Sequence, residues 1–122
     1  MLTPNYTLLY VDSPETSARL YAGLLGAEPV ETSPTFCLFA LGNGRMLGLW
    51  GKAGVEPAYD FHGSGSELGF RVASPAAVDA LHAQWREQGL RILQAPVQMD
   101  FGYTFTGADP DGHRLRVFSR TE

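Results

Sequence analysis

The sequence of 122 residues has a single cysteine, Cys37, few basic residues and no long apolar run. One cysteine excludes an intrachain disulfide and a metal cluster built from several cysteines. Only nine residues are Lys or Arg, against 13 Asp and Glu, so we expect no nucleic-acid binding. No apolar stretch approaches the roughly 18 residues that cross a bilayer, and the N-terminus lacks the pattern of a signal peptide. We therefore expect a cytoplasmic protein that binds neither nucleic acid nor membrane.

What the chain does contain is an internal repeat. Tyr10-Val11-Asp12-Ser13-Pro14 is matched 61 residues later by Arg71-Val72-Ala73-Ser74-Pro75, and residues 44–50 are matched 68 residues later by residues 112–118. A duplication indicates one supersecondary unit used twice. The 44% apolar and 18% charged residues are typical of a globular protein. We expect a single domain over residues 1–122, with modules at about 1–52 and 66–122 and a linker at about 53–65.

Each repeat predicts one strand, one helix and three further strands. Ser13-Pro14 and Ser74-Pro75 are typical of helix starts, because a serine hydroxyl caps the first turn and proline fits its first position. Gly26 and Gly89 are typical of the residue that ends a helix. Runs of β-forming residues predict strands at residues 7–11, 29–32, 36–41, 45–50, 68–72, 92–96, 103–108 and 113–119. The sequence therefore predicts an α+β fold of two β-α-β-β-β modules in tandem.

Alternation along these strands assigns their side chains to a face under the helices or to the opposite face. Asn43-Gly44 is a strong signal for a two-residue turn, and that turn would place Phe39 opposite Gly48. The face opposite the helices gathers aromatic and charged side chains, a composition that marks ligand clefts and protein interfaces. Its predicted members are Tyr6, Leu8, Tyr10, Phe39, Met46, Gly48, Trp50, Glu67, Gly69, Arg71, Arg114, Arg116 and Phe118.

The duplicated unit and the late turn Asp109-Pro110-Asp111-Gly112-His113 resemble the vicinal oxygen chelate superfamily, which includes glyoxalase I, extradiol dioxygenases and bleomycin-resistance proteins. This resemblance covers essentially the whole chain and implies a curved mixed sheet around a concave cleft. Thr3-Pro4-Asn5, Leu47-Gly48-Leu49-Trp50, Glu56-Pro57 and Phe101-Gly102-Tyr103-Thr104-Phe105 are in turn similar to phenazine antibiotic resistance proteins. Those proteins are drug-binding homodimers, so the resemblance implies a homodimer that binds a drug.

Enzymes of the superfamily hold a divalent metal at four positions, which the resemblance places on Tyr6, Gly48, Glu67 and Arg116. Only Glu67 is a ready ligand. Gly48 has no side chain, Arg116 is permanently positive, and the phenol of Tyr6 has an ordinary pKa of about 10. Because a divalent metal needs several His or carboxylate ligands, we expect neither a metal nor a cofactor.

The remaining reactive side chains form no catalytic constellation in the sequence. We interpret His113 as a solvated turn residue, His82 as a surface or packing residue, and His62 as a linker residue without a visible partner. Cys37 lies within a predicted strand and is expected to be a small buried apolar residue. We therefore assign no catalytic residue.

Trp50 is the expected anchor for a planar aromatic ligand, because aromatic stacking contributes about 0.5–1.5 kcal/mol beyond burial. Its alternative is a place in the core or in a dimer interface. Arg71 and Arg116 would pair a ligand carboxylate, unless Glu67 neutralises Arg116 within the protein. The further residues expected to bind the ligand are Tyr6, Tyr10, Phe39, Gly48, Glu67 and Phe118.

The sequence and its resemblance together predict metal-free capture of a small planar aromatic compound, of phenazine antibiotic type, by a cytoplasmic homodimer. Two alternatives stay open. One is a metal-dependent glyoxalase- or dioxygenase-like enzyme, and the other is a dimerisation module that binds no ligand.

Overall fold

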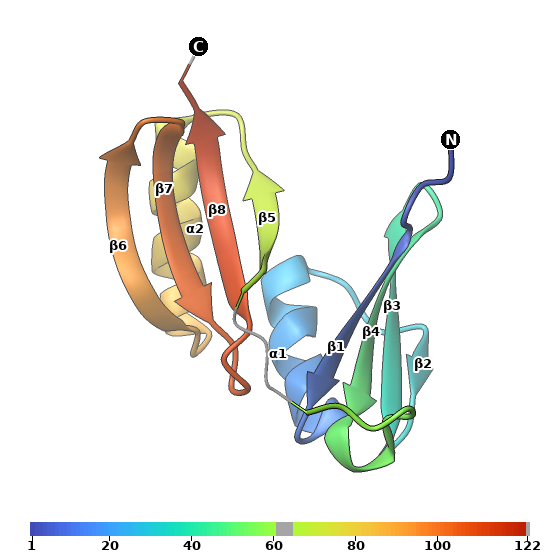
Figure 1. The fold of residues 1–122 in the computed structure, drawn as a ribbon. Helices are drawn as coiled ribbons and strands as arrows, with labels where there is room; N and C mark the ends of the chain where they lie inside the picture. Colours follow the sequence, from blue (N-terminus) through green and yellow to red (C-terminus); the bar gives the residue numbers. More distant parts are fainter. Residues whose placement is uncertain (61–64, 122) are drawn as a thin grey trace. The chain divides into compact units, whose positions relative to one another are not determined.

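The computed structural model describes residues 1–60 and 65–121 (Figure 1). The chain divides into two compact units, Met1–Phe61 and His62–Glu122, which we call unit 1 and unit 2. In the described residues no helix is long and apolar enough to cross a membrane. His62 lies outside the described residues, and the assignment of residues 1–122 to a single domain stays a prediction.

Unit 1 contains one helix and one four-stranded mixed sheet. Its elements are β1 (Tyr6–Val11), α1 (Pro14–Leu25), β2 (Glu31–Thr32), β3 (Phe36–Gly42), β4 (Arg45–Gly51) and the 3-10 turn η1 (Lys52–Gly54). The strand order is β1-β4-β3-β2. β1 runs parallel to β4, whereas β3 is antiparallel to both β4 and β2.

Unit 2 repeats this arrangement. Its elements are β5 (Glu67–Arg71), α2 (Pro75–Glu87), β6 (Arg91–Met99), β7 (Gly102–Ala108) and β8 (Arg114–Arg120), in the strand order β5-β8-β7-β6. In Figure 1, α2 lies behind this sheet, and it contacts β6, β7 and β8. The predicted α+β fold of two β-α-β-β-β modules is confirmed. β6 is longer than the predicted strand at residues 92–96.

The duplication extends to the pairing of the strands. Tyr6 pairs with Met46 in unit 1, and Glu67 pairs with Arg114 in unit 2. Glu67 follows Tyr6 by 61 residues and Arg114 follows Met46 by 68, the two spacings of the sequence repeat. Corresponding positions of the repeat therefore occupy corresponding places in the two sheets.

Both helices begin where the sequence predicts. The Oγ of Ser13 accepts a hydrogen bond from the backbone N–H of Thr16 at 3.3 Å, and the Oγ of Ser74 accepts one from Ala77 at 3.2 Å. These bonds satisfy backbone donors that the first turn of a helix leaves unpaired. Gly26 follows α1 with φ 67°, the left-handed conformation that glycine adopts without a steric penalty.

The core of each unit lies between its helix and its sheet. In unit 1, Tyr21 of α1 is fully buried with Cys37, Leu47 and Leu49 of the sheet, so Cys37 is the small buried residue that was expected. In unit 2, Trp85 of α2 makes edge contacts with Phe70 and Phe105, with ring centroids 5.3 and 5.9 Å apart.

The two remaining described histidines take structural positions. His82 packs edge-on against Phe105, with centroids 5.3 Å apart, which agrees with its interpretation as a packing residue. His113 is partly buried, and its backbone N–H donates to the Oδ1 of Asp109 at 2.8 Å. The N–H of Gly112 donates to the carbonyl of Asp109 at 3.0 Å, which closes the predicted turn.

The register of the first hairpin differs from the prediction at one position. Asn43 and Gly44 have φ 54° and 75° and form the expected two-residue turn, since Gly42 pairs with Arg45. The register then shifts between Ala40 and Gly42.

This shift by one residue reverses every side chain of β3 beyond it, because strand side chains alternate between faces. Phe39 therefore pairs with Leu47 on the helix side and is 0% exposed, and Leu38 takes the place opposite Gly48. The prediction that Phe39 lies on the face opposite the helix is wrong.

Candidate functional site

The open face of the first sheet, opposite α1, is largely aromatic and apolar. The exposed fractions of Tyr6 and Leu8 are 57% and 45%, high values for large apolar side chains. Because apolar surface of this kind usually marks a binding site, this face is a candidate site in its own right. We call it the aromatic face, and the pairing of the strands gives its members as Tyr6, Leu8, Tyr10, Glu31, Phe36, Leu38, Ala40, Met46, Gly48 and Trp50.

Trp50 is half-buried at the end of β4 and is held by a cluster of rings. Tyr10 meets it edge-on, with centroids 6.2 Å apart and planes at 86°. Tyr59 then packs on Tyr10 at 4.9 Å. Aromatic pairs prefer such edge and tilted geometries, so the cluster limits the orientations that Trp50 can adopt. Tyr59 lies beyond β4 in the segment predicted to be a linker, and its role was not predicted.

Gly48 provides space for neighbouring side chains. A Cβ added there would lie 2.6 Å from Cδ2 of Leu8 and 3.0 Å from Cζ of Phe36, so these two side chains cover the glycine. In unit 2, Gly69 lies close to Phe118. A Cβ added at Gly69 would lie 3.6 Å from Cε1 of that ring. The space that Gly48 leaves is therefore filled by side chains of the protein itself.

The open face of the second sheet, opposite α2, carries five of the six arginines of unit 2. We call it the basic face, and its charged members are Glu67, Arg71, Arg91, Arg114, Arg116 and Arg120. Phe118 shares this face and meets Phe101 edge-on, with centroids 6.1 Å apart. Unlike the aromatic face, the basic face combines rings with cations.

Arg116 lies at the centre of a polar network on the basic face. Its Nε donates to Oε1 of Glu67 at 2.5 Å, and its Nη1 donates to Oε1 of Gln94 at 3.4 Å and to Oγ1 of Thr104 at 3.3 Å. The guanidinium carbon also stands 5.8 Å from the ring centre of Phe101, within the range of a cation–π contact. The sequence left two partners open for Arg116, a ligand carboxylate or Glu67. The structure contains the ion pair with Glu67.

Thr104, Thr106, Gln94 and Phe101 were not predicted as parts of this face. The strand pairing explains the first two, since Thr104 pairs with Phe118 and Thr106 with Arg116. Thr104 is fully buried and donates its hydroxyl to the carbonyl of Val117 at 2.8 Å. The buried hydroxyl of Thr106 has no hydrogen-bond partner among the described residues. Threonines at the alternate positions 104 and 106 of a predicted strand were the signal that the sequence offered.

The superfamily's metal positions do not fit a divalent metal in this chain. The carboxylate of Glu67 is engaged by Arg116, whose permanent charge opposes a bound cation. Gly48 has no donor atom and is covered by Leu8 and Phe36. In residues 1–60 and 65–121, no three His, Cys, Asp or Glu side chains gather in a way that could hold a metal ion. The donor set is therefore that of an ion pair, not of a metal site.

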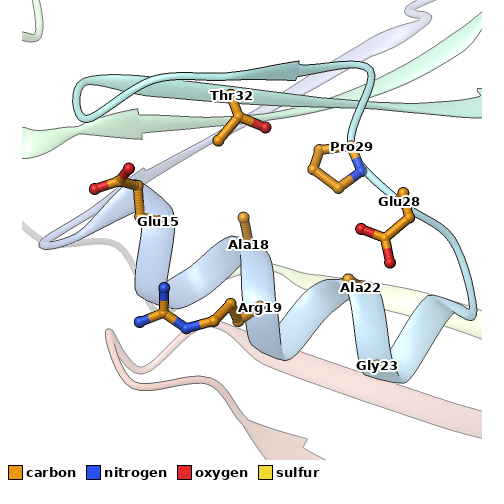
Figure 2. A pocket seen from close by; sticks show the side chains of 8 residues that line it. All are labelled: Glu15, Ala18, Arg19, Ala22, Gly23, Glu28, Pro29 and Thr32. Atoms are coloured by element: carbon orange, nitrogen blue, oxygen red, sulfur yellow. The ribbon is translucent and has the colours of Figure 1, made fainter.

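A separate hollow of about 510 Å³ lies in unit 1 between α1 and the segment leading into β2 (Figure 2). Small side chains make room for it, and Figure 2 shows Ala18 and Ala22 at its helix side. It is lined by Glu15, Ala18, Arg19, Ala22, Gly23, Glu28, Pro29 and Thr32. None of these residues was predicted to bind a ligand, and the hollow lies on the helix side of the sheet.

Comparison with known proteins gives relatives over nearly the whole chain. A phenazine antibiotic resistance protein, EhpR, of Enterobacter agglomerans is 32% identical over 119 residues, which cover 95% of this chain and 91% of that protein. The solution structure of protein ATC0852 from Agrobacterium tumefaciens is 52% identical, covers 100% of both chains and has a TM-score of 0.90.

A glyoxalase-related enzyme from Fulvimarina pelagi shares the fold, at 23% identity and a TM-score of 0.87, over 98% of this chain and 89% of that one. The sequence model of the Glyoxalase/Bleomycin resistance protein/Dioxygenase superfamily matches residues 3–117. The duplicated modules, their strand orders and this match lead to one conclusion: the chain belongs to the Glyoxalase/Bleomycin resistance protein/Dioxygenase superfamily.

Proposed function

We propose that this chain binds a small planar aromatic compound of the phenazine antibiotic type and captures it without chemical change. The observation that carries the proposal is the aromatic face, where Trp50 is held by Tyr10 beside the exposed Tyr6 and Leu8. The 32% identity to a phenazine antibiotic resistance protein supports the choice of ligand class.

Trp50 is the proposed main contact for the ligand ring. It is only half-buried, and it is oriented by Tyr10, which itself packs on Tyr59. An indole held in one orientation loses little conformational freedom on binding, so more of the stacking energy remains as affinity. Stacking of this kind contributes about 0.5–1.5 kcal/mol beyond the burial of apolar area.

The proposal includes no metal and no catalytic residue. The engagement of Glu67 by Arg116 and the covered position of Gly48 support this choice. Resistance would follow from stoichiometric capture of the drug. A homodimer in the cytoplasm is the assembly and location that we propose with it.

Calorimetric titration of the purified protein with phenazine tests the proposal. We expect saturable binding at a fixed ratio of phenazine to protein, together with quenching of Trp fluorescence. Trp50→Ala should weaken binding by about three- to tenfold, and Trp50→Phe, which keeps an aromatic ring, by less. In Trp50→Phe the quenching should disappear, because the remaining Trp85 is 3% exposed in the core.

Elemental analysis of the same preparation and sedimentation of the apo protein complete the test. A stoichiometric divalent metal, with turnover of a substrate that a chelator abolishes, would establish the enzyme alternative and overturn the proposal. Phenazine affinity that is equal in the wild type and Trp50→Ala would remove the aromatic face as the ligand site. Absence of any binding by a stable dimer would favour a dimerisation module.

A further inference from the structure

The hollow beside α1 lies on the side of the first sheet opposite to the aromatic face (Figure 2). Its lining residues all fall within residues 15–32, in α1, in the connection that follows it and in β2. The hollow is therefore complete within unit 1. Ligand sites for small molecules commonly have volumes of about 300–1,000 Å³, so a hollow of about 510 Å³ has room for a small ligand.

The floor of the hollow consists of small apolar groups. Ala18 and Ala22 lie one helical turn apart on α1, and Ala18 is 5% exposed. Figure 2 shows the methyl group of Ala18 directed across the hollow towards Thr32. None of the eight side chains that line it is aromatic. The floor therefore suits a narrow aliphatic chain better than a planar ring.

The charged side chains of the hollow are Glu15, Arg19 and Glu28, which leave one negative charge in excess. Figure 2 shows the carboxylates of Glu15 and Glu28 at opposite ends of the hollow, with Ala18 between them. All three charged side chains are exposed. Because a cleft with an excess of negative charge attracts cations, we expect a cationic ligand.

Within the described part of the chain, both carboxylates are left without a cationic partner. Arg19 follows Glu15 by four residues, which is the spacing of an ion pair on a helix. Its Nη2 instead donates to Oγ1 of Thr16 at 3.3 Å. Glu28 forms no hydrogen bond or ion pair with residues 1–60 and 65–121. Each end of the hollow therefore has a carboxylate that can accept hydrogen bonds from a ligand.

We propose that this hollow is a second ligand site and binds an aliphatic diamine. One ammonium group lies at Glu15, the other lies at Glu28, and the methylene chain covers Ala18 and Ala22. Hydrogen bonds between ammonium and carboxylate groups are stronger than those between neutral groups. Arg19 opposes the cation and limits its affinity. Because water screens exposed carboxylates, we expect a Kd in the millimolar range.

A titration with cadaverine at low ionic strength, followed by amide NMR spectra, tests the proposal. We expect saturable shifts of the amides of Ala18, Ala22, Gly23 and Thr32, and no shift of the indole N–H of Trp50. Pentylamine, which has one ammonium group, should bind about two- to fivefold more weakly. Pentanediol, which has none, should cause no shifts there, and added salt should weaken the binding of cadaverine. Equal shifts with pentanediol would overturn the proposal.

Variants test the charge and the shape of the hollow separately. Glu15→Gln and Glu28→Gln should each weaken cadaverine binding about two- to fivefold. Arg19→Gln should strengthen it by a similar factor, because it removes the opposing charge. Ala22→Leu keeps the charge and fills the hollow, so the saturable shifts should disappear. Glu87→Gln is the matched control, since it removes an exposed carboxylate from the end of α2 in unit 2. It should leave the affinity unchanged.

Circular dichroism shows whether each variant is folded. If Ala22→Leu does not fold, the exposed positions Glu28 and Arg19 still decide, because their substitutions have effects of opposite sign. Weaker binding in Arg19→Gln, or an equal loss in Glu87→Gln, would overturn the proposal. Failure of phenazine to bind the wild type would leave this site standing. Absence of cadaverine shifts around the hollow would overturn this site and leave the aromatic face unaffected.

Discussion

Arg116 and Glu67 are joined across the neighbouring strands β8 and β5 by an ion pair of 2.5 Å between Nε and Oε1. The exposed fractions of the two side chains are 18% and 36%, so water screens the pair. Exposed pairs contribute about 0–1 kcal/mol to folding. The pair therefore affects the electrostatic field at the basic face more than it affects the free energy of unfolding.

Glu67→Gln should accordingly lower the free energy of unfolding by less than about 1 kcal/mol. Glutamine keeps an acceptor for Nε of Arg116 and removes only the charge. Urea denaturation of the variant and the wild type measures the difference. A loss of several kcal/mol would show that the pair stabilises unit 2 in a way that its exposure does not indicate.

Phe39→Ala should lower the free energy of unfolding by about 3–5 kcal/mol, because it leaves a cavity in the core of unit 1. Phe36→Ala, on the half-buried open side of the same strand, should cost clearly less. The order of the two losses in urea denaturation tests the register of β3. The register without the bulge predicts the reverse order.

Gly48→Ala and Gly102→Ala form a second matched pair. At Gly48 the new methyl group meets the end of Leu8, a 45% exposed side chain that can move aside, so the loss should stay below about 1 kcal/mol. At Gly102, with φ 155°, it meets the backbone carbonyl of Ser119, which cannot move alone. We expect a loss of about 3 kcal/mol or more there. Thermal unfolding of both variants measures the two losses of stability. Equal losses would contradict the expectation that Gly102→Ala is the more costly change.

Thr106→Val should leave stability unchanged or raise it by about 1 kcal/mol, because it removes a buried hydroxyl that has no partner among the described residues. Thr104→Val is the control on the same strand. It deletes the 2.8 Å bond to the carbonyl of Val117 and should cost about 1–3 kcal/mol. Calorimetric melting of the two variants measures both changes in stability. A loss in Thr106→Val as large as that in Thr104→Val would show that the Thr106 hydroxyl is satisfied in solution.

Tyr103 of β7 donates its hydroxyl to Oδ1 of Asp79 on α2 at 2.7 Å. This hydrogen bond, followed by burial and the charge of Asp79, raises the pKa of Tyr103 above its ordinary value of 10.0. The contribution to stability is therefore complete below the unfolded pKa of about 10 and is lost as the pH rises through the folded pKa.

Tyr103→Phe should thus lower the urea midpoint at neutral pH, and the difference from the wild type should shrink in alkaline solution. Denaturation at a series of pH values measures this trend. Asp79→Asn provides the control, because it removes the charge that helps to raise the pKa. A difference that grows with pH would contradict the assignment.

Much of the fold follows from signals that act over a few residues. Ser13-Pro14 and Ser74-Pro75 mark both helix starts because the cap and the helical turn are only three residues apart. Asn43-Gly44 marks the hairpin because few other residue pairs tolerate its backbone angles. The repeat likewise predicts the two modules, since the same local signals occur twice.

The candidate site was predicted less completely. The open-face positions of Tyr6, Trp50 and Arg116 follow from alternation along uninterrupted strands. The position of Phe39 does not, because residues 36–39 are all apolar and alternation there supports either register. The bulge between Ala40 and Gly42 decided it by burying Phe39.

The sequence by itself determined the duplication, the helix starts and the class of the fold. These depend on the identity of residues and on contacts between near neighbours in the chain. Tertiary structure alone decided that Phe39 is core, that Tyr10 and Tyr59 hold Trp50, and that Arg91 and Arg120 share a face with the three arginines predicted there. Each of these depends on the register between strands that are distant in the chain, and a shift of one residue reverses the face on which a side chain lies.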